Sequence, residues 1–442
     1  MVDIVFIPIG FMGLGSFCLM KNFENNKICD IVHNSAFKNG LWLYILQIFN
    51  MVIPIFTLPY VTRILGVYQY GVFSIGLNFI GYLQVLVDYG FNMSATRFVI
   101  LNKNDKNKLN DCFTGVLYSR FFLVGIGLLL LLCYVVFVDS TNRVGMLVLF
   151  LYVLGTALQI DWFYQGMMEM KYILFINVIA RSFFLVGVFE LVKGQHDLLI
   201  YCFLYGFTPV SSGIIGIMWA KKKYKISLNK FSILSVKIHL MDGWYVFTTQ
   251  LSSTIFGAIG VTFLGMFSEP CVVGGFSAIQ KIPLVILMLW SPISRVLYPL
   301  SSKKFHTSFL DGMKFIKMIM YKIILVFVLV VLFLSLFSRN VIEISFGQDY
   351  VEYYYWIFPL MFWVLVAIFN NFLGIQILLG SGYDKEYSAC FQKSVIATVV
   401  LNFAFIYLWE GTGAAMAPLM SEIFLTVLLL RTVKVISGKY NT

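Results

Sequence analysis

Charged residues are scarce in this sequence. Lysine, arginine, aspartate and glutamate make up 12% of its 442 residues, whereas a typical soluble domain carries about 25%. Hydrophobic residues make up 60%. A soluble fold has too little interior to hide that much apolar surface, so the composition excludes a soluble enzyme or binding domain and predicts an integral membrane protein.

Motifs for metal binding, nucleophilic catalysis and ATP use are also missing. The seven cysteines are scattered without a CxxC spacing, so disulfides and structural zinc are not expected. A membrane enzyme acting on lipid-linked sugars needs general bases or nucleophiles grouped near one leaflet. The four histidines, His33, His196, His239 and His306, instead fall in predicted tails or loops, which makes such an enzyme the weaker alternative. A Walker A sequence is absent, so transport would draw on an ion gradient or on the substrate's own gradient.

Twelve apolar stretches come close to the length of about 20 residues that a helix needs to cross a hydrocarbon core of about 30 Å. The fourth is short, and the tenth starts with aromatic residues, Tyr353 to Trp356, that are typical of the membrane interface. The sequence therefore predicts an all-α integral membrane fold of about twelve transmembrane helices. The predicted spans are 41–62, 71–91, 113–138, 144–161, 172–192, 198–220, 243–267, 271–291, 319–338, 354–380, 388–410 and 414–431.

Lysine and arginine are distributed unevenly between alternate connections. One side holds most of them, whereas the other holds only Arg63, Arg143, Lys193 and Arg339. Because cytoplasmic loops retain positive charge during insertion, we predict that both ends of the helical body and the long middle loop are cytoplasmic. The net charge of +11 then reflects membrane topology, and no nucleic-acid partner is expected.

The two halves carry a weak internal repeat. Without a gap, Gly40 aligns with Gly243 and Phe73 with Phe276. With six helices per half, the repeats share one orientation, which predicts a pseudo-twofold axis along the membrane normal and a substrate path between two lobes. Residues 1–19 make a poor signal peptide, and they either add a thirteenth span or precede a natural start at Met20. The predicted parts are an N-terminal segment at 1–37, a six-helix lobe at 38–220, a basic amphipathic linker at 221–242, and a second lobe with a short cytoplasmic tail at 243–442.

Several short motifs resemble a known family. They are Asn39–Trp42, Pro59–Gly66, Tyr70–Ser74, Val87–Phe91 and Asp161–Gly166, the last reading DWFYQG. This pattern is similar to that of the Wzx-type polysaccharide flippases of the multidrug/oligosaccharidyl-lipid/polysaccharide exporter superfamily. The likeness covers residues 34–166 well, and the second half agrees mainly in topology and charge placement.

The resemblance implies two six-helix lobes around a central cavity in the bacterial inner membrane. It implies transport of undecaprenyl-pyrophosphate-linked oligosaccharide repeat units, of O-antigen or a related surface polysaccharide, from the cytoplasmic to the periplasmic leaflet. The implied partners are this lipid-linked oligosaccharide, the lipid bilayer, and the polymerase and chain-length proteins of the same pathway. No cofactor is implied beyond proton or sodium coupling.

Four basic residues fall inside predicted helices: Arg120, Arg181, Lys281 and Lys393. Burying a cation at mid-bilayer costs about 2.5–3.5 kcal/mol on insertion scales, so such residues normally face a partner or a water-filled cavity. A pyrophosphate headgroup would be such a partner, which makes these four the predicted substrate and cavity residues. Arg120 and Lys393 lie within two turns of predicted cytoplasmic ends, where snorkelling to the interface is the alternative.

Three acidic residues are candidates for gating or coupling. Asp88 and Asp161 lie at predicted cytoplasmic helix ends, where they would make gating contacts. Glu422, within the twelfth predicted helix, would pair with Lys281 or Lys393, or exchange a proton or cation during transport. The nearest alternative function is a multidrug/cation antiporter of the same superfamily. An antiporter would carry acids in the N-terminal lobe, where Arg120 and Arg181 lie instead.

Overall fold

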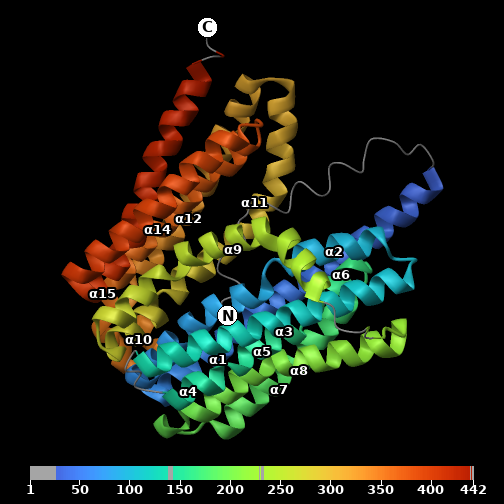
Figure 1. Cartoon of the computed structure of the whole chain (residues 1–442). Coiled ribbons are helices and arrows are strands. Elements are labelled where there is room, and N and C mark those ends of the chain that lie inside the picture. The colour runs from blue at the N-terminus through green and yellow to red at the C-terminus, as the bar shows by residue number, and fades with distance from the viewer. Residues whose placement is uncertain (1–25, 138–142, 228, 230–232, 439, 441–442) are drawn as a thin grey trace. The chain divides into compact units, whose positions relative to one another are not determined.

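The computed structural model describes residues 26–137, 143–227, 229, 233–438 and 440, so the question about residues 1–19 lies outside it. The described residues form helices and turns without a strand (Figure 1). By their internal contacts they divide into two compact units, one reaching Thr254 and the other running from Ile255. This division falls inside helix α9 (Ile233–Phe267). The assignment of two six-helix lobes stays a prediction.

The first unit contains helices α1 to α8 and the first part of α9. Helix α5 packs on α1 and α8, and α7 also packs on both (Figure 1). The helices are α1 (Asn26–Asp88), α2 (Phe91–Leu101), α3 (Lys106–Phe137), α4 (Arg143–Leu149), α5 (Leu151–Leu158), α6 (Asp161–Gly166), α7 (Met170–Leu191), the single 3-10 turn η2 (Gln195–Asp197) and α8 (Leu198–Tyr224).

Helix α1 contains a break at Gly66. Its 63 residues would extend for about 95 Å at 1.5 Å per residue, far more than one bilayer crossing requires. Gly66 has φ 72° and ψ 172°, a conformation that glycine adopts readily because it lacks a Cβ. The break separates the predicted spans 41–62 and 71–91. The glycine that ends the Pro59–Gly66 motif therefore ends the first membrane helix.

Gly155 lies at a close contact between α5 and α8. A Cβ placed there would lie 2.5 Å from the backbone nitrogen of Val210 and 2.6 Å from the carbonyl carbon of Pro209. Small residues let membrane helices pack backbone against backbone in this way.

We expect Gly155→Ala to destabilise the protein by about 1–3 kcal/mol, because the added methyl group forces the two backbones apart. The measurement is the midpoint of thermal unfolding of the purified protein in detergent. Gly125→Ala is the matched control, since a Cβ there has no atom within 4 Å. Equal midpoints for the two variants would show that the close contact contributes no stability.

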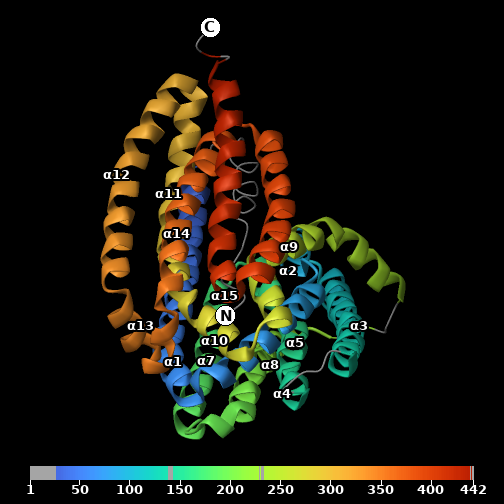
Figure 2. The same cartoon turned by 90° about the vertical axis from the view of Figure 1, so that its left-hand side faces the viewer.

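The second unit contains the rest of α9 and all later helices. Helix α14 packs on α11, α12 and α15, and these helices run side by side in Figure 2. The elements are α10 (Pro270–Ile279), α11 (Lys281–Thr307), α12 (Phe309–Leu336), α13 (Ser338–Phe346), the 3-10 helix η3 (Gln348–Trp356), α14 (Ile357–Asn371), the π-helix η4 (Phe372–Leu379) and α15 (Asp384–Gly438).

The tenth predicted span consists of three helical forms in succession. Its aromatic start is the 3-10 helix η3, which continues as α14 and then as the π-helix η4. Gln376 in η4 is fully buried. Its side-chain amide donates to the hydroxyl of Ser294 at 3.1 Å and accepts from Ser301 at 3.0 Å. These bonds fix η4 to α11, the helix that carries Pro292 and Pro299.

Ten helices in the described part of the chain are long and apolar enough to cross a membrane. Two of them, Ile45–Leu101 and Asp384–Gly438, each contain two predicted spans. The second is broken at Trp409 and Glu410, where the backbone departs from helical angles. All twelve predicted stretches lie on these ten helices, and the prediction of an all-α integral membrane fold is confirmed.

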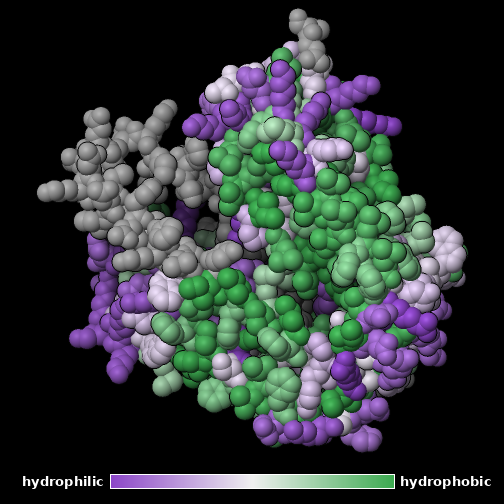
Figure 3. All heavy atoms as spheres, turned by 180° about the vertical axis from the view of Figure 1, so that it is seen from behind, coloured by the Kyte–Doolittle hydropathy of each residue, from purple (hydrophilic) through white to green (hydrophobic). Residues whose placement is uncertain are grey.

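Apolar side chains cover much of the surface. In Figure 3, hydrophobic residues form broad areas and hydrophilic residues gather at their margins. On α12, Leu325, Leu329 and Phe333 are each more than half exposed. Exposed apolar areas of this extent would associate in water. The chain is a multi-pass membrane protein, and these areas contact lipid.

Candidate functional site

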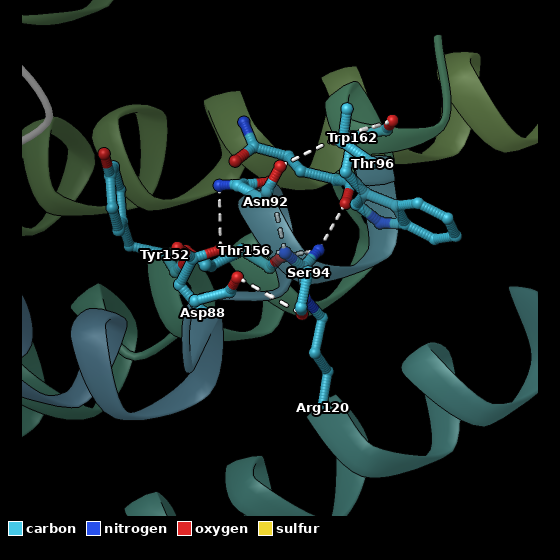
Figure 4. A network of polar contacts seen from close by, with 10 residues as sticks. Asp88, Asn92, Ser94, Thr96, Arg120, Tyr152, Thr156 and Trp162 are labelled. Carbon is cyan, nitrogen blue, oxygen red and sulfur yellow. Dashed lines mark hydrogen bonds and ion pairs between the residues drawn. The ribbon is translucent and has the colours of Figure 1, made fainter. Parts of the chain in front are cut away.

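Arg120 is the centre of a polar cluster in the first unit. Its side chain is 1% exposed, and one guanidinium nitrogen lies 2.8 Å from the carboxylate of Asp88. The same nitrogen lies 3.4 Å from the side-chain oxygen of Asn92. Figure 4 shows Arg120 extending from its helix toward these two residues. Two side chains that the sequence marks separately, one as a cavity residue and one as a gate, thus form a buried ion pair.

The ends of three helices bring the partners of Arg120 together. Asp88 is the last residue of α1, and Asn92 lies in the first turn of α2, after a tight turn in which Tyr89 and Gly90 both have positive φ. The other guanidinium nitrogen donates to the backbone carbonyls of Thr156, at 3.2 Å, and Gln159 at the end of α5. Carbonyls in the last turn of a helix have no partner within the helix and carry partial negative charge. They are therefore natural acceptors for a buried cation.

Asp161 is the third charged member of this cluster. It begins α6, the helix formed by the DWFYQG motif, and is half-buried. Both Asp161 and Asp88 interact favourably with the charge of Arg120. The arginine charge is therefore balanced by protein groups in this structure. Its role toward substrate, and the gating roles of the two aspartates, stay predictions.

Arg181 and Lys281 differ from Arg120 in having no compensating charge among the described residues. Both are half-buried, Arg181 near the middle of α7 and Lys281 at the start of α11, near the middle of the predicted span 271–291. Neither forms a hydrogen bond or ion pair with any residue in the described part of the chain. Cations in membrane helices are rare and normally face a partner or water. These two are the strongest candidates for binding an anionic ligand.

Lys393 lies on the surface of the second unit. It is exposed on the first half of α15. An exposed lysine can reach the interface with its long side chain, as in the snorkelling alternative. Its cavity role stays a prediction.

Glu422 is buried in the second unit, with 7% of the residue exposed. The side-chain amide of Asn370 donates to its carboxylate at 2.6 Å and to its backbone carbonyl at 2.9 Å. Thr426 in turn donates to Asn370 at 2.8 Å. Neither Lys281 nor Lys393 forms an ion pair with this carboxylate in the described structure. Asn370, on α14, is the partner that the sequence does not indicate.

Comparison with known proteins assigns a family. Residues 36–305, more than half of the chain, match the family model described as "Polysaccharide biosynthesis protein". The chain belongs to this polysaccharide biosynthesis family. The resemblance indicated by the motifs between Asn39 and Gly166 is thereby confirmed.

Two curated relatives of this chain carry the same name, "Putative O-antigen transporter". The one from Escherichia coli (strain K12) is 27% identical over 90% of this chain and 96% of its own length. The one from Shigella dysenteriae is 24% identical over 90% of this chain and its own full length.

Two solved structures share the fold at low sequence identity. One is the lipid II flippase MurJ in an inward closed conformation, at 13% identity and a TM-score of 0.69, covering 89% of this chain and 87% of MurJ. The other is an inward-facing multidrug resistance MATE transporter of the MOP superfamily, at 13% identity and a TM-score of 0.67, covering 88% of this chain and 96% of that chain. This chain thus has the exporter-superfamily fold.

A second charged cluster of this protein lies just after the DWFYQG helix. Glu169, which connects α6 and α7, accepts hydrogen bonds from Lys223 and Tyr224 at the end of α8. The Lys223 ammonium lies 4.5 Å from the ring centre of Tyr172. Burial opposes ionisation of Glu169, but the hydrogen bonds from Lys223 and Tyr224 outweigh it and hold the pKa of this carboxyl below its usual value. Among the described residues, no group of three histidines, cysteines or acids is arranged to hold a metal ion.

We expect the Glu169 cluster to stabilise the protein at neutral pH and to lose this effect in acid. Because the folded pKa lies below the unfolded value of about 4.3, the contribution is present above that value and disappears as the pH falls through the folded pKa. A half-exposed pair of this kind contributes about 0.5–1 kcal/mol. Thermal unfolding midpoints of the parent and Glu169→Gln should differ at about pH 6 and converge in acid. A constant difference across this range would contradict the assignment.

Proposed function

We propose that this protein is a flippase for lipid-linked oligosaccharide repeat units of a bacterial surface polysaccharide. It moves an undecaprenyl-pyrophosphate-linked unit from the cytoplasmic to the periplasmic leaflet of the inner membrane, with both ends of its helical body in the cytoplasm. The names of its two curated relatives and its fold likeness to the lipid II flippase MurJ support this substrate class. The polymerase and chain-length proteins of the same pathway are its proposed partners.

The observation that carries the proposal is the pair of unpaired intramembrane cations. Arg181 in the first unit and Lys281 in the second have no protein counter-charge among the described residues. An anionic pyrophosphate supplies that counter-charge while the substrate is bound. The cost of placing its charges in a low dielectric falls when fixed cations accompany them. Arg120 and Lys393 complete the proposed cationic set, and Asp88 and Asp161 hold Arg120 as part of a gate.

The alternative is a multidrug/cation antiporter, and a multidrug resistance MATE family transporter shares the fold of this chain. Such a protein would recognise a cationic substrate through unpaired acids. In the first unit, Asp88 is engaged by Arg120, and Arg181 adds a further positive charge. This balance favours an anionic substrate. A membrane enzyme is disfavoured because the histidines of this chain do not group in a membrane helix.

Glu422 is the proposed coupling residue. A buried carboxylate without a cationic partner exchanges a proton more readily than one held in an ion pair. Proton binding and release at Glu422 would link transport to the proton gradient.

We expect Glu422→Gln to lower the transport rate at least tenfold and to remove its dependence on the proton gradient. Glu422→Asp should retain both the transport and its dependence on the gradient. The glutamine side chain can still accept the hydrogen bond from Asn370, so the unfolding midpoint should change little. Transport by Glu422→Gln at the parent rate, with the same dependence on the gradient, would eliminate the coupling role.

The experiment that tests the proposed function is complementation. The native flippase is deleted from a strain that makes a defined surface polysaccharide, and this chain is expressed in its place. Surface polysaccharide should return in a host with the matching repeat unit. A host with that repeat unit that stays bare, despite normal membrane levels of the protein, would contradict the flippase function. If this chain instead makes the same strain more resistant to drugs, that result would favour the antiporter.

A further inference from the structure

A groove in the first unit lies between α3 and the start of α9. We call it the α3–α9 groove, and its volume is about 640 Å³. This is within the range of about 300–1,000 Å³ that is typical of small-ligand sites. Its apolar wall is formed by Tyr118, Phe121 and Phe122 of α3 and by Leu240, Met241 and Trp244 of α9. Among the lining residues that the structure describes, Lys237 is the only charged one, and it is exposed.

Helix α9 contacts the α1–α2 turn at one place, and the groove lies beside that contact. At that place Phe247 stacks on Tyr89, with ring centres 4.5 Å apart. A Cβ on Gly243 would lie 2.8 Å from the Tyr89 carbonyl oxygen, so the helix touches the α1–α2 turn directly. Toward its N-terminus α9 runs beside α3 with the groove between them. Figure 2 shows these two helices next to each other.

The wall of the groove opens onto the lipid-facing surface. Phe121 and Phe122 are 45% and 56% exposed, and Met241 and Trp244 are 66% and 51% exposed. Apolar rings exposed on a membrane helix are covered by hydrocarbon. The groove is thus continuous with the bilayer, and its natural contents are lipid chains.

The position of Lys237 selects one kind of lipid. It lies near the start of α9, which follows the basic end of α8 at Lys221 to Lys223, on the predicted cytoplasmic side. An ammonium group near the surface of an anionic leaflet is attracted to the negatively charged headgroups. A single cation balances the single negative charge of a phosphodiester, whereas a pyrophosphate carries more. We propose that the α3–α9 groove binds one anionic phospholipid of the cytoplasmic leaflet, with an acyl chain against the aromatic wall and the phosphate at Lys237.

This site rests on the membrane-embedded fold and not on the proposed transport. The bound lipid fills the space beside α9. The chain passes from the first unit to the second within this helix, between Thr254 and Ile255. The test therefore measures binding directly.

The experiment reconstitutes the full chain in liposomes that contain a small fraction of brominated phosphatidylglycerol or brominated phosphatidylcholine. Bromine quenches nearby tryptophan emission, and the difference between the parent and Trp244→Phe isolates the signal of Trp244 from that of the other seven tryptophans. We expect the anionic lipid to quench this signal at least twice as strongly as the zwitterionic lipid. Lys237→Gln should abolish the preference, and Lys222→Gln, an exposed lysine of α8, should keep it.

Native mass spectrometry of the same variants gives an independent readout that does not depend on the behaviour of Trp244→Phe. The parent and Lys222→Gln should retain one more phosphatidylglycerol than Lys237→Gln. Equal quenching by both lipids, or equal lipid retention by Lys237→Gln and Lys222→Gln, would overturn the proposal.

Discussion

Replacing Arg181 and Lys281 by alanine is expected to abolish restoration of surface polysaccharide by this protein. A hydrogen bond to a charged group is worth about 1.5–3 kcal/mol, and about 1.4 kcal/mol corresponds to a tenfold change. Each single variant should therefore lower transport about tenfold or more. The double variant should lower it at least a hundredfold, because each cation offers an independent counter-charge to the pyrophosphate.

Two kinds of control make the result specific. Arg181→Lys and Lys281→Arg keep the charge and should retain much of the transport, since a cation at that depth is what the headgroup requires. Lys385→Ala removes an exposed lysine at the start of α15 and should have no effect. All variants are compared at matched membrane levels. Full activity of both alanine variants would leave transport intact as a function and remove these residues from the site.

Arg120→Met is expected to destabilise the protein by about 3–5 kcal/mol, the second large effect. The substitution leaves the Asp88 carboxylate, 14% exposed, without its cation, and breaking a buried ion pair carries a cost of this size. It also leaves the carbonyls of Thr156 and Gln159 without their donor. The midpoint of thermal unfolding in detergent and the level of folded protein in the membrane measure the loss.

The double variant Arg120→Met/Asp88→Leu separates a stabilising role from a gating role. Removing both charges should recover part of the stability, because the Asp88 carboxylate is no longer buried without its cation. Only part returns, because Asp161 still loses its favourable interaction with Arg120. If the pair also belongs to a gate, transport stays low despite the recovered stability. Lys108→Ala is the matched control, since it removes an exposed ion pair with Asp105 at 3.7 Å, with side chains 59% and 45% exposed. It should cost less than about 1 kcal/mol. A similar small loss for Arg120→Met would show that the buried pair does not hold the helix ends together.

The membrane fold was predictable from the sequence because length and hydropathy alone decide whether a helix crosses a bilayer. The break in α1 falls at Gly66, the end of a recognised motif. The DWFYQG motif forms the short helix α6. These features are local, since they depend on residues that are neighbours in the chain.

The pairing of charges was not predictable because it depends on which helix ends meet. Asp88 and Arg120 are both recognisable as unusual residues, yet their contact requires α3 to pack against the end of α1. The end of α5 must also approach, because it supplies further acceptors. For Glu422 the sequence indicates Lys281 or Lys393 as a partner, whereas α14 places Asn370 beside it. Buried polar groups are normally hydrogen-bonded, and a neutral amide donor such as that of Asn370 can satisfy a carboxylate in place of a cation.

The Glu169 cluster was missed for a similar reason, although one signal was present. Glu169 lies three residues after the last residue of the DWFYQG motif, and Lys223 belongs to a run of lysines at the end of α8. The predicted topology places both on the cytoplasmic side, where opposite charges can meet. Sequence alone does not show that α6, α7 and α8 bring these two residues into contact.

Transport by the purified protein in proteoliposomes tests the central claim most directly. A short-chain polyprenyl-pyrophosphate-linked oligosaccharide carrying a fluorescent group is placed in both leaflets, and a membrane-impermeant quencher reports the fraction that crosses. The parent chain should accelerate crossing at least tenfold over empty liposomes and over the Arg181→Ala/Lys281→Ala variant. Crossing at the rate of empty liposomes, by protein that is folded and matched to the repeat unit, would contradict the flippase function.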